Sequence, residues 1–215
     1  MSTIQKFVPA AAIIGLSSAS FLTAYITSFT VLAIPVVETG ASKENARFAA
    51  KQWQKAFDLG KSFAPPFAIT CAACFGFLAV QTRGIVGRYP VSPSVLYATA
   101  AVLAPSIVPF TIAVMGPTTL DPLIAKADGS PNAPGDQETL DLIKKWSGQN
   151  AVRAGLIGSA ALMSAFAILA QTTKGPAGLS KLGQTATRAA QQARPVSAAG
   201  AQIKATRNIN TKAKR

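Results

Sequence analysis

The feature that most constrains this chain is a set of four long stretches without a charged side chain, at Phe7–Val37, Ser62–Thr82, Val91–Met115 and Ala154–Ala170. A helix needs about 20 apolar residues to cross a hydrocarbon core about 30 Å thick. The first three stretches are long enough, and the fourth becomes so if its helix begins near Gln149. Lipid offers no partner to unpaired backbone groups, so these stretches must be helices rather than strands.

The sequence therefore predicts an all-α membrane protein whose fold is a bundle of four transmembrane helices. We expect spans at about residues 8–34, 62–82, 92–116 and 149–171, within one transmembrane domain of residues 1–173. A chain of 215 residues leaves no room for a second globular domain. A cleavable signal peptide is the alternative for the first stretch, but a signal core of about 7–15 residues is much shorter than this run.

Small residues recur at every fourth position in three of the expected helices. Such stripes let helix backbones approach closely in lipid, where packing and interhelical hydrogen bonds replace the hydrophobic drive. The stripes are Ala11, Gly15, Ala19, Thr23 and Thr27, then Ala68, Ala72 and Gly76, and last Ala151, Gly155 and Ser159. We expect each stripe to face a neighbouring helix.

Prolines and small polar residues mark several helix ends. Ser92-Pro93 combines an N-cap with proline at the first helical position, and so predicts the start of the third span. Pro105 and Pro109 predict a kink near the other end of that span. A second cap followed by proline predicts a short helix over Pro122–Ala127.

Most of the net positive charge lies in the C-terminal tail, residues 174–215. The tail has nine basic and no acidic side chains, in a chain of net charge +13. We expect this tail to be disordered and able to contact anionic lipid headgroups, at about 1 kcal/mol per basic residue near the surface. It contains no aromatic residue for base stacking, so nucleic acid is not an expected partner. Counting the tail, the positive-inside rule predicts cytoplasmic termini.

Several chemistries are excluded by residue type. The chain has no histidine, which removes a Ser-His-Asp triad, histidine-ligated haem and the two-His-one-carboxylate iron site. Cys71 and Cys74 form one pair inside the second span, too few for a zinc site, and are expected to be small buried apolar side chains. No glycine-rich phosphate loop or dinucleotide fingerprint occurs. We therefore expect no metal and no tightly held cofactor.

Three side chains, here called the polar ladder, lie at the start of the last apolar stretch. Trp146, Asn150 and Arg153 are spaced four and three residues apart, so on a helix they lie on one face and can address one ligand. They are equally typical of an interfacial anchor, with tryptophan at the headgroup level and arginine reaching toward the lipid phosphates. The residues alone leave both interpretations open, an anchor or a small-molecule site.

This ladder, with an earlier motif, resembles the anthrone oxygenase-like family of fungal four-span membrane proteins. The motif is Pro109-Phe110-Thr111, Met115-Gly116-Pro117-Thr118-Thr119 and Leu123. The four-span layout, the chain length and the long third loop resemble that family as well, over roughly residues 8–170. The resemblance implies oxidation of anthrone-type polyketides to anthraquinones in secondary metabolism, with molecular oxygen as co-substrate and no cofactor.

Under this resemblance we hypothesise roles for the site residues. Arg153 stabilises an enolate, Asn150 bonds a carbonyl or hydroxyl of the substrate, and Trp146 stacks on its flat rings. Thr118 and Thr119 line the facing helix end and contact substrate. The candidate bases are Asp121 and Glu38, with Asp58 and Asp141 in the same set of loops and Tyr25 as a more remote alternative.

Two other functional classes stay open. One is a non-catalytic membrane scaffold or accessory protein of the same family, and the other is a small-molecule carrier. A carrier usually has internal repeats with interrupted helices in both halves, and none is evident here. The family's biosynthetic role implies an integral protein of the endoplasmic reticulum membrane.

Overall fold

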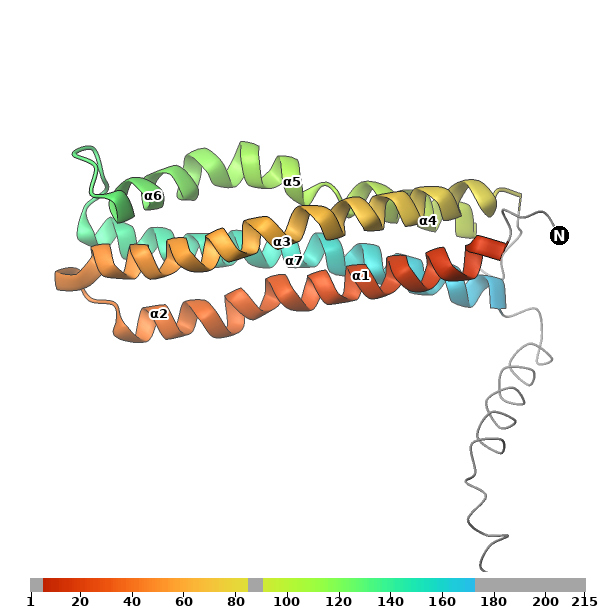
Figure 1. The fold of residues 1–215 in the computed structure, drawn as a ribbon, viewed down its shortest axis with the longest axis horizontal. Helices are drawn as coiled ribbons and strands as arrows, with labels where there is room; N and C mark the ends of the chain where they lie inside the picture. Colours follow the sequence, from red (N-terminus) through yellow and green to blue (C-terminus); the bar gives the residue numbers. More distant parts are fainter. Residues whose placement is uncertain (1–5, 85–90, 173–215) are drawn as a thin grey trace, which may run out of the picture. The chain divides into compact units, whose positions relative to one another are not determined.

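The structure is a computed structural model that describes residues 6–84 and 91–172, and every element in these ranges is helical. The helices form four rods in chain order, as Figure 1 shows. The first rod is α1 (Val8–Ser28), the π-helical turn η2 (Phe29–Ala33) and α2 (Ile34–Gly40). The second is the 3-10 turn η3 (Lys43–Asn45) and α3 (Ala46–Gln81). The third is α4 (Pro93–Leu103), α5 (Ile107–Phe110), the π-helical η4 (Thr111–Leu120) and α6 (Asp121–Asp128), and the fourth is α7 (Asp136–Thr172).

All four rods are long and apolar enough to cross a membrane, which confirms the predicted four-helix membrane fold. The second and fourth helices begin earlier than the spans expected from residues 62 and 149, since α3 starts at Ala46 and α7 at Asp136. An uncharged stretch shows which part of a helix can lie in lipid, but it does not show where the helix begins or ends. Charged residues such as Lys51 and Lys55 continue α3 beyond it.

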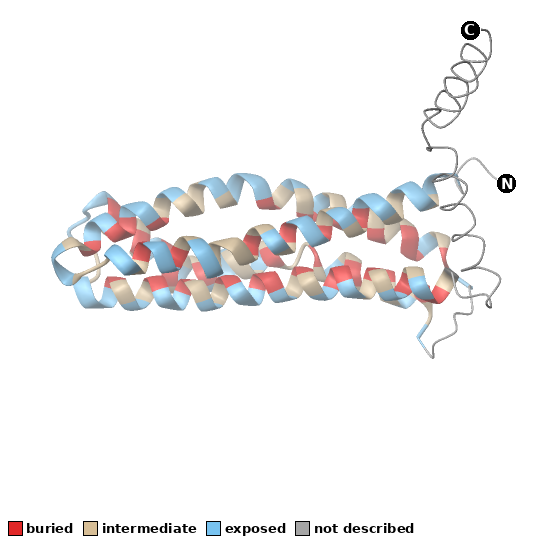
Figure 2. Ribbon diagram, turned by 90° about the horizontal axis from the view of Figure 1, so that it is seen from below, coloured by how far each residue is buried: buried red, intermediate tan, exposed pale blue. Residues whose placement is uncertain are grey.

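Successive rods run in opposite directions (Figure 1), so that α1 begins and α7 ends at the same end of the bundle. Buried residues line the inner faces of the rods and exposed residues their outer faces (Figure 2). Large apolar side chains are exposed on every rod, among them Ile13, Ile69, Val102 and Leu162. An apolar outer surface of this kind suits lipid contact. The cytoplasmic location of the termini stays a prediction, and the basic tail lies outside the described residues.

The third rod is interrupted where proline was expected to disturb it. Its α-helical structure ends at Leu103, and residues 104–106 form a turn around Pro105 before α5 begins. Its start also agrees with the sequence, because the side chain of Ser92 accepts a hydrogen bond from the backbone N–H of Val95 at 3.4 Å. The helix expected at Pro122–Ala127 occurs as α6 but follows η4 without a break.

The small-residue stripes pack unequally. In the first stripe Gly15 is buried against Phe75 of α3, so close that a Cβ atom there would lie 2.7 Å from the ring. The third stripe was predicted to face a neighbour, and this is wrong, since Ala151, Gly155 and Ser159 are all exposed. The buried face of α7 runs instead through Trp146, Asn150, Arg153 and Ile157 and continues along other small residues such as Ala160 and Ala167.

Two separate apolar clusters fill the bundle. One contains Leu22, Phe75, Tyr97 and Ile157 and lies toward the end where α4 begins. The other is built around Trp53, Met115, Leu123, Ile143 and Trp146, near α6. The polar side chains Asn150 and Arg153 belong to neither cluster. They lie on α7 between Trp146 and Ile157, so the polar ladder is at the junction of the two clusters.

Candidate functional site

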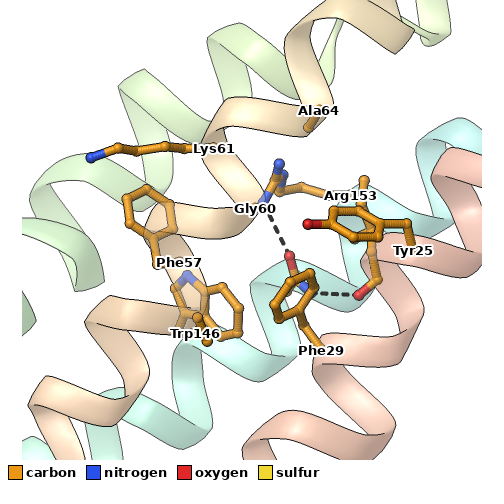
Figure 3. Close-up of a pocket in the computed structure, with 11 residues that line it drawn as sticks. Tyr25, Phe29, Phe57, Gly60, Lys61, Ala64, Trp146 and Arg153 are labelled. Atoms are coloured by element: carbon orange, nitrogen blue, oxygen red, sulfur yellow. Dashed lines mark hydrogen bonds between the residues drawn. The ribbon is translucent and has the colours of Figure 1, made fainter.

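The three ladder residues of α7 line one internal cavity. Trp146, Asn150 and Arg153 are 2%, 1% and 9% exposed, so all three point into the bundle. Helix α1 contributes Tyr25 and Ile26, and α3 contributes residues from 56 to 64 (Figure 3). The predicted common face is therefore observed, and the burial of the tryptophan and the arginine argues against an anchor at the membrane surface.

Asn150 ties α7 to the first rod. Its side-chain nitrogen donates to the carbonyl oxygen of Ile26 at 2.9 Å and to the hydroxyl of Thr30 at 3.2 Å. Its side-chain oxygen accepts from Nη1 of Arg153 at 3.0 Å, the bond drawn in Figure 3. The π-helical turn η2 follows immediately after this part of α1, and such turns are frequent at functional sites. Both N–H donors of the amide are thus already used.

Arg153 is a buried cation without an anion. Its Nε–H has no hydrogen-bond partner, and neither of the ion pairs among the described residues includes it. A buried guanidinium without a counter-charge is costly, and ionisable groups inside membrane helices usually face a partner or a pathway. The arrangement favours binding of an oxygen that is negatively charged, or becomes so, next to Arg153.

Trp53 extends the site on the α3 side. It is fully buried, and its ring meets Trp146 edge to face at a centroid distance of 5.8 Å and stacks on Phe57 at 5.5 Å. The indole N–H groups of both tryptophans lack an acceptor in the described part of the chain. A buried donor without a partner costs about 1–3 kcal/mol. Of these two donors only that of Trp146 belongs to a residue lining the cavity, where a ligand oxygen would satisfy it.

Sequence reasoning missed Trp53 and gave little weight to Tyr25. Trp53 lies before the second span expected at residues 62–82, and Tyr25 lies in the first expected span, where it is only a remote alternative for the base. The sequence did contain one indication, because the chain has only two tryptophans, Trp53 and Trp146. In the structure their indoles are in contact. The charged residues around Trp53 concealed it, since they placed it outside the expected span.

Thr118 and Thr119 lie at the end of η4 but do not line the cavity. The hydroxyl of Thr119 donates to the side-chain oxygen of Gln149 at 2.7 Å, and the Gln149 side-chain nitrogen donates to Thr118 at 2.8 Å. Gln149 precedes Asn150, so the threonines hold the neighbouring side of α7. They are positioned to support the site rather than to contact a ligand in this cavity.

The carboxylates expected as bases are also outside this cavity. Glu38 lines a separate cavity with Gln137 and Lys144, and Asp121 is exposed at the start of α6. Asp58 forms an ion pair with Lys61 at 2.6 Å. Asp141 accepts a hydrogen bond from Gln137 at 3.3 Å. No group of three or more His, Cys, Asp or Glu side chains that could hold a metal ion occurs within residues 6–84 and 91–172.

Tyr25 and Lys61 carry the other ionisable groups of the cavity lining. The hydroxyl of Tyr25 donates to the carbonyl oxygen of Leu59 across the gap between α1 and α3, at 3.5 Å. The Tyr25 ring is packed between Phe29 and Phe63. Lys61 is engaged by Asp58 and is largely exposed. Tyr25 is thus the one acidic oxygen group that the described lining offers beside Arg153.

The space around Arg153 is divided in two. The cavity lined by the ladder, here called the inner cavity, has a volume of about 20 Å³, room for about one water-sized molecule. A second space, the outer cavity, has a volume of about 190 Å³ and lies between α3 and the third rod. Both are lined by Phe57, Lys61, Ala64 and Arg153. Arg153 therefore stands between a small void and a larger one.

Comparison with known proteins gives consistent matches. The family model described as anthrone oxygenase matches residues 53–163, which include Trp53, Trp146, Asn150 and Arg153. Anthrone oxygenase tpcL of Aspergillus fumigatus is 30% identical over 135 residues, covering 63% of this chain and 78% of that protein. Anthrone oxygenase encC of the same fungus is 24% identical over 183 residues, covering 79% and 96% respectively. The search of solved structures found no significant match.

Proposed function

Because the chain belongs to the anthrone oxygenase family, we propose that it is a cofactor-free monooxygenase that oxidises anthrone-type polyketides to anthraquinones. The observation that carries the proposal is the buried guanidinium of Arg153, which has no counter-charge among the described residues and lines the outer cavity. A cation held there in advance stabilises negative charge that develops on a ligand oxygen, and it does so more strongly than in water. Oxidation of an anthrone begins with such a charge.

The chemistry needs little from the protein. The methylene of an anthrone lies between two aryl rings and loses a proton to form an enolate, whose oxygen carries most of the charge. The electron-rich carbon then reacts with molecular oxygen, forming a C–O bond and, after protonation, a hydroperoxide. Loss of water leaves a second carbonyl, so one oxygen atom enters the quinone and the other leaves as water. Oxygen is the oxidant and the methylene carbon is oxidised.

We assign the roles from the contacts. Arg153 stabilises the enolate oxygen, and Trp146, expected to stack on the rings, lines only the inner cavity and offers its unpaired N–H there. Asn150, expected to bind substrate directly, uses both of its donors on Ile26 and Thr30. Its role in the proposal is therefore to hold Arg153. Thr118 and Thr119 do not bind the substrate in this proposal but hold Gln149, the residue before Asn150.

Proton removal requires an acceptor near Arg153. Glu38 and Asp121 do not line either cavity that reaches Arg153. Tyr25 lines the inner cavity together with Arg153 (Figure 3). We therefore assign proton removal to the phenolate oxygen of Tyr25, which takes the methylene proton and, as the neutral hydroxyl, donates a hydrogen bond to the Leu59 carbonyl. General acid–base groups of this kind contribute about 10²- to 10⁴-fold in rate.

The proposal is tested with membranes that contain the full chain. Emodin anthrone is supplied under air, and quinone formation is followed for wild type, Arg153→Ala, and empty membranes. Loss of an oxyanion-stabilising group costs about 10²- to 10³-fold in kcat, so Arg153→Ala should approach the empty membranes. Arg83→Ala, a change at an exposed arginine beyond α3, serves as the matched control and should match wild type. Equal rates in all samples would show that the chain is a non-catalytic member of its family.

A further inference from the structure

The outer cavity exists because the third rod bends away from α3. Helix α3 packs closely against α4 and against α6, but much less against the α5–η4 segment between them. In Figure 1 this segment arches away from α3, starting at the turn around Pro105. The outer cavity lies under the arch, lined on one side by Pro65 and Ala64 and on the other by Ile107, Val108 and residues 111–112. Arg153 is the contribution of α7.

The arch faces the outside of the bundle with apolar side chains. Ile112, which lines the outer cavity, is 70% exposed, and Val114 next to it is 41% exposed. In a membrane protein such residues are in contact with lipid. The cavity therefore reaches from a lipid-facing surface at Ile112 inward to the buried guanidinium of Arg153.

The level of this opening in the membrane follows from the length of the uncharged part of α3. The segment from Lys61 to Gln81, the end of α3, is uncharged after its first residue. At 1.5 Å per residue it is about 30 Å long, the thickness of a hydrocarbon core. Lys61 and its partner Asp58 thus mark one membrane surface, and both cavities are lined by Lys61. The opening is at the level where aromatic molecules with polar substituents collect in a bilayer.

We propose that the ligand of this protein, a flat aromatic ketone with phenolic hydroxyls, enters sideways from the membrane interface between α3 and the α5–η4 arch. Its rings lie in the outer cavity next to Arg153, at the boundary with the inner cavity that Tyr25 and Trp146 line. The inner cavity, with room for about one water-sized molecule, is too small for the rings. The class of ligand in this inference rests on the proposed function. The place of the cavity and of its opening rests on the structure alone.

Binding is measured separately from turnover, with emodin as the probe. The chain has only two tryptophans, Trp53 and Trp146, which are in contact beside Arg153. Quenching of their fluorescence by emodin therefore reports occupation of this site in the full chain reconstituted in phospholipid vesicles. Val108→Phe fills the outer cavity, and overpacking of this kind should raise the Kd about tenfold. Val114→Phe, on the same arch but not lining the cavity, is the control and should stay within about twofold of wild type.

A second variant addresses the route of entry. Ile112→Phe narrows the rim at a lipid-exposed position, where folding is not at risk, and should slow emodin association in stopped-flow measurements. Val102→Phe is its matched control, because Val102 is also 70% exposed but lies on α4 outside the cavity. Circular dichroism during heating checks that all variants are folded.

The outcomes separate the two proposals. Wild-type affinity for Val108→Phe together with a wild-type association rate for Ile112→Phe would overturn the inference, as would wild-type protein that emodin does not quench saturably. If quenching depends on Val108 and Ile112 as stated but the protein oxidises no anthrone, the binding site stands and the proposed oxygenase function fails.

Discussion

The side-chain oxygen of Asn150 accepts a 3.0 Å hydrogen bond from Nη1 of Arg153, one helical turn further along α7. The same amide donates to Ile26 and Thr30 on the first rod. The guanidinium is thus positioned by a residue that is itself fixed by a second helix. This relationship turns a charged side chain that would otherwise sample many rotamers into a group with a defined direction.

Replacing Asn150 by alanine should misplace Arg153 without removing its charge. We expect kcat for anthrone oxidation to fall about 10²-fold while KM changes little, because a displaced catalytic group affects the transition state more than ground-state binding. Gln137→Ala is the matched control, since Gln137 is an exposed amide on the same helix that bonds to Asp141, away from Arg153. Similar losses in kcat for the two variants would contradict a specific positioning role for Asn150.

Tyr25→Phe removes the hydroxyl proposed to transfer the proton and keeps the ring that packs against Phe29 and Phe63. We expect kcat to fall about 10²-fold, and the rate to become more sensitive to deuterium at the anthrone methylene as proton removal becomes limiting. Tyr97→Phe is the control, because the Tyr97 hydroxyl bonds to Gln171 in the other half of the bundle. An unchanged isotope effect in Tyr25→Phe would exclude Tyr25 from the proton-transfer step.

Trp146→Phe keeps an aromatic ring against Trp53 but removes an N–H that has no acceptor among the described residues. Thermal stability should fall modestly, because the smaller ring leaves part of the buried indole volume unfilled although no hydrogen bond of the free protein is lost. Affinity for emodin should fall by about 1 kcal/mol, roughly fivefold, if the ligand supplies the acceptor. Wild-type affinity for emodin in Trp146→Phe would argue for a purely structural indole.

Gly15 and Gly76 give a stability prediction that does not depend on function. Alanine at position 15 would place Cβ 2.7 Å from the Phe75 ring, whereas at position 76 it would meet nothing within 4 Å. We expect Gly15→Ala to lower the free energy of unfolding by about 1–2 kcal/mol through overpacking. Gly76→Ala should be neutral or stabilising, because alanine is the better helix former. The midpoints of thermal unfolding in detergent check both.

The number and type of elements could be predicted because lipid imposes strong rules. Four uncharged stretches of sufficient length are enough to specify four helices, and Ser92 and Pro105 marked a helix start and a break correctly. The start of α3 could not be placed from the same rule. Lys51 and Lys55 point outward from a helix whose other face buries Trp53, a distinction visible only when the neighbouring rods are present.

The residues that α7 contributes to the candidate site could be predicted from the sequence, but the residues that the other rods contribute could not. Spacing alone put Trp146, Asn150 and Arg153 on a shared face, because helical periodicity is local. Which residues of other rods meet that face depends on how far each rod is shifted along its neighbour. The carboxylates Glu38 and Asp121 were expected nearby because they precede or follow a span, yet the shift of the rods separates them from Arg153.

Gln149 and Asn150 bond to two different rods, η4 on one side and α1 on the other. Adjacent residues on a helix point about 100° apart. This dipeptide therefore fixes the rotation of α7 about its own axis, because turning the helix breaks one pair of bonds or the other. An insertion or deletion of one residue in the loop before α7 leaves this angle intact. One between positions 149 and 150 changes the angle, and one between positions 150 and 153 swings Arg153 out of both cavities. Length variation among related chains should accordingly be confined to the regions outside that turn.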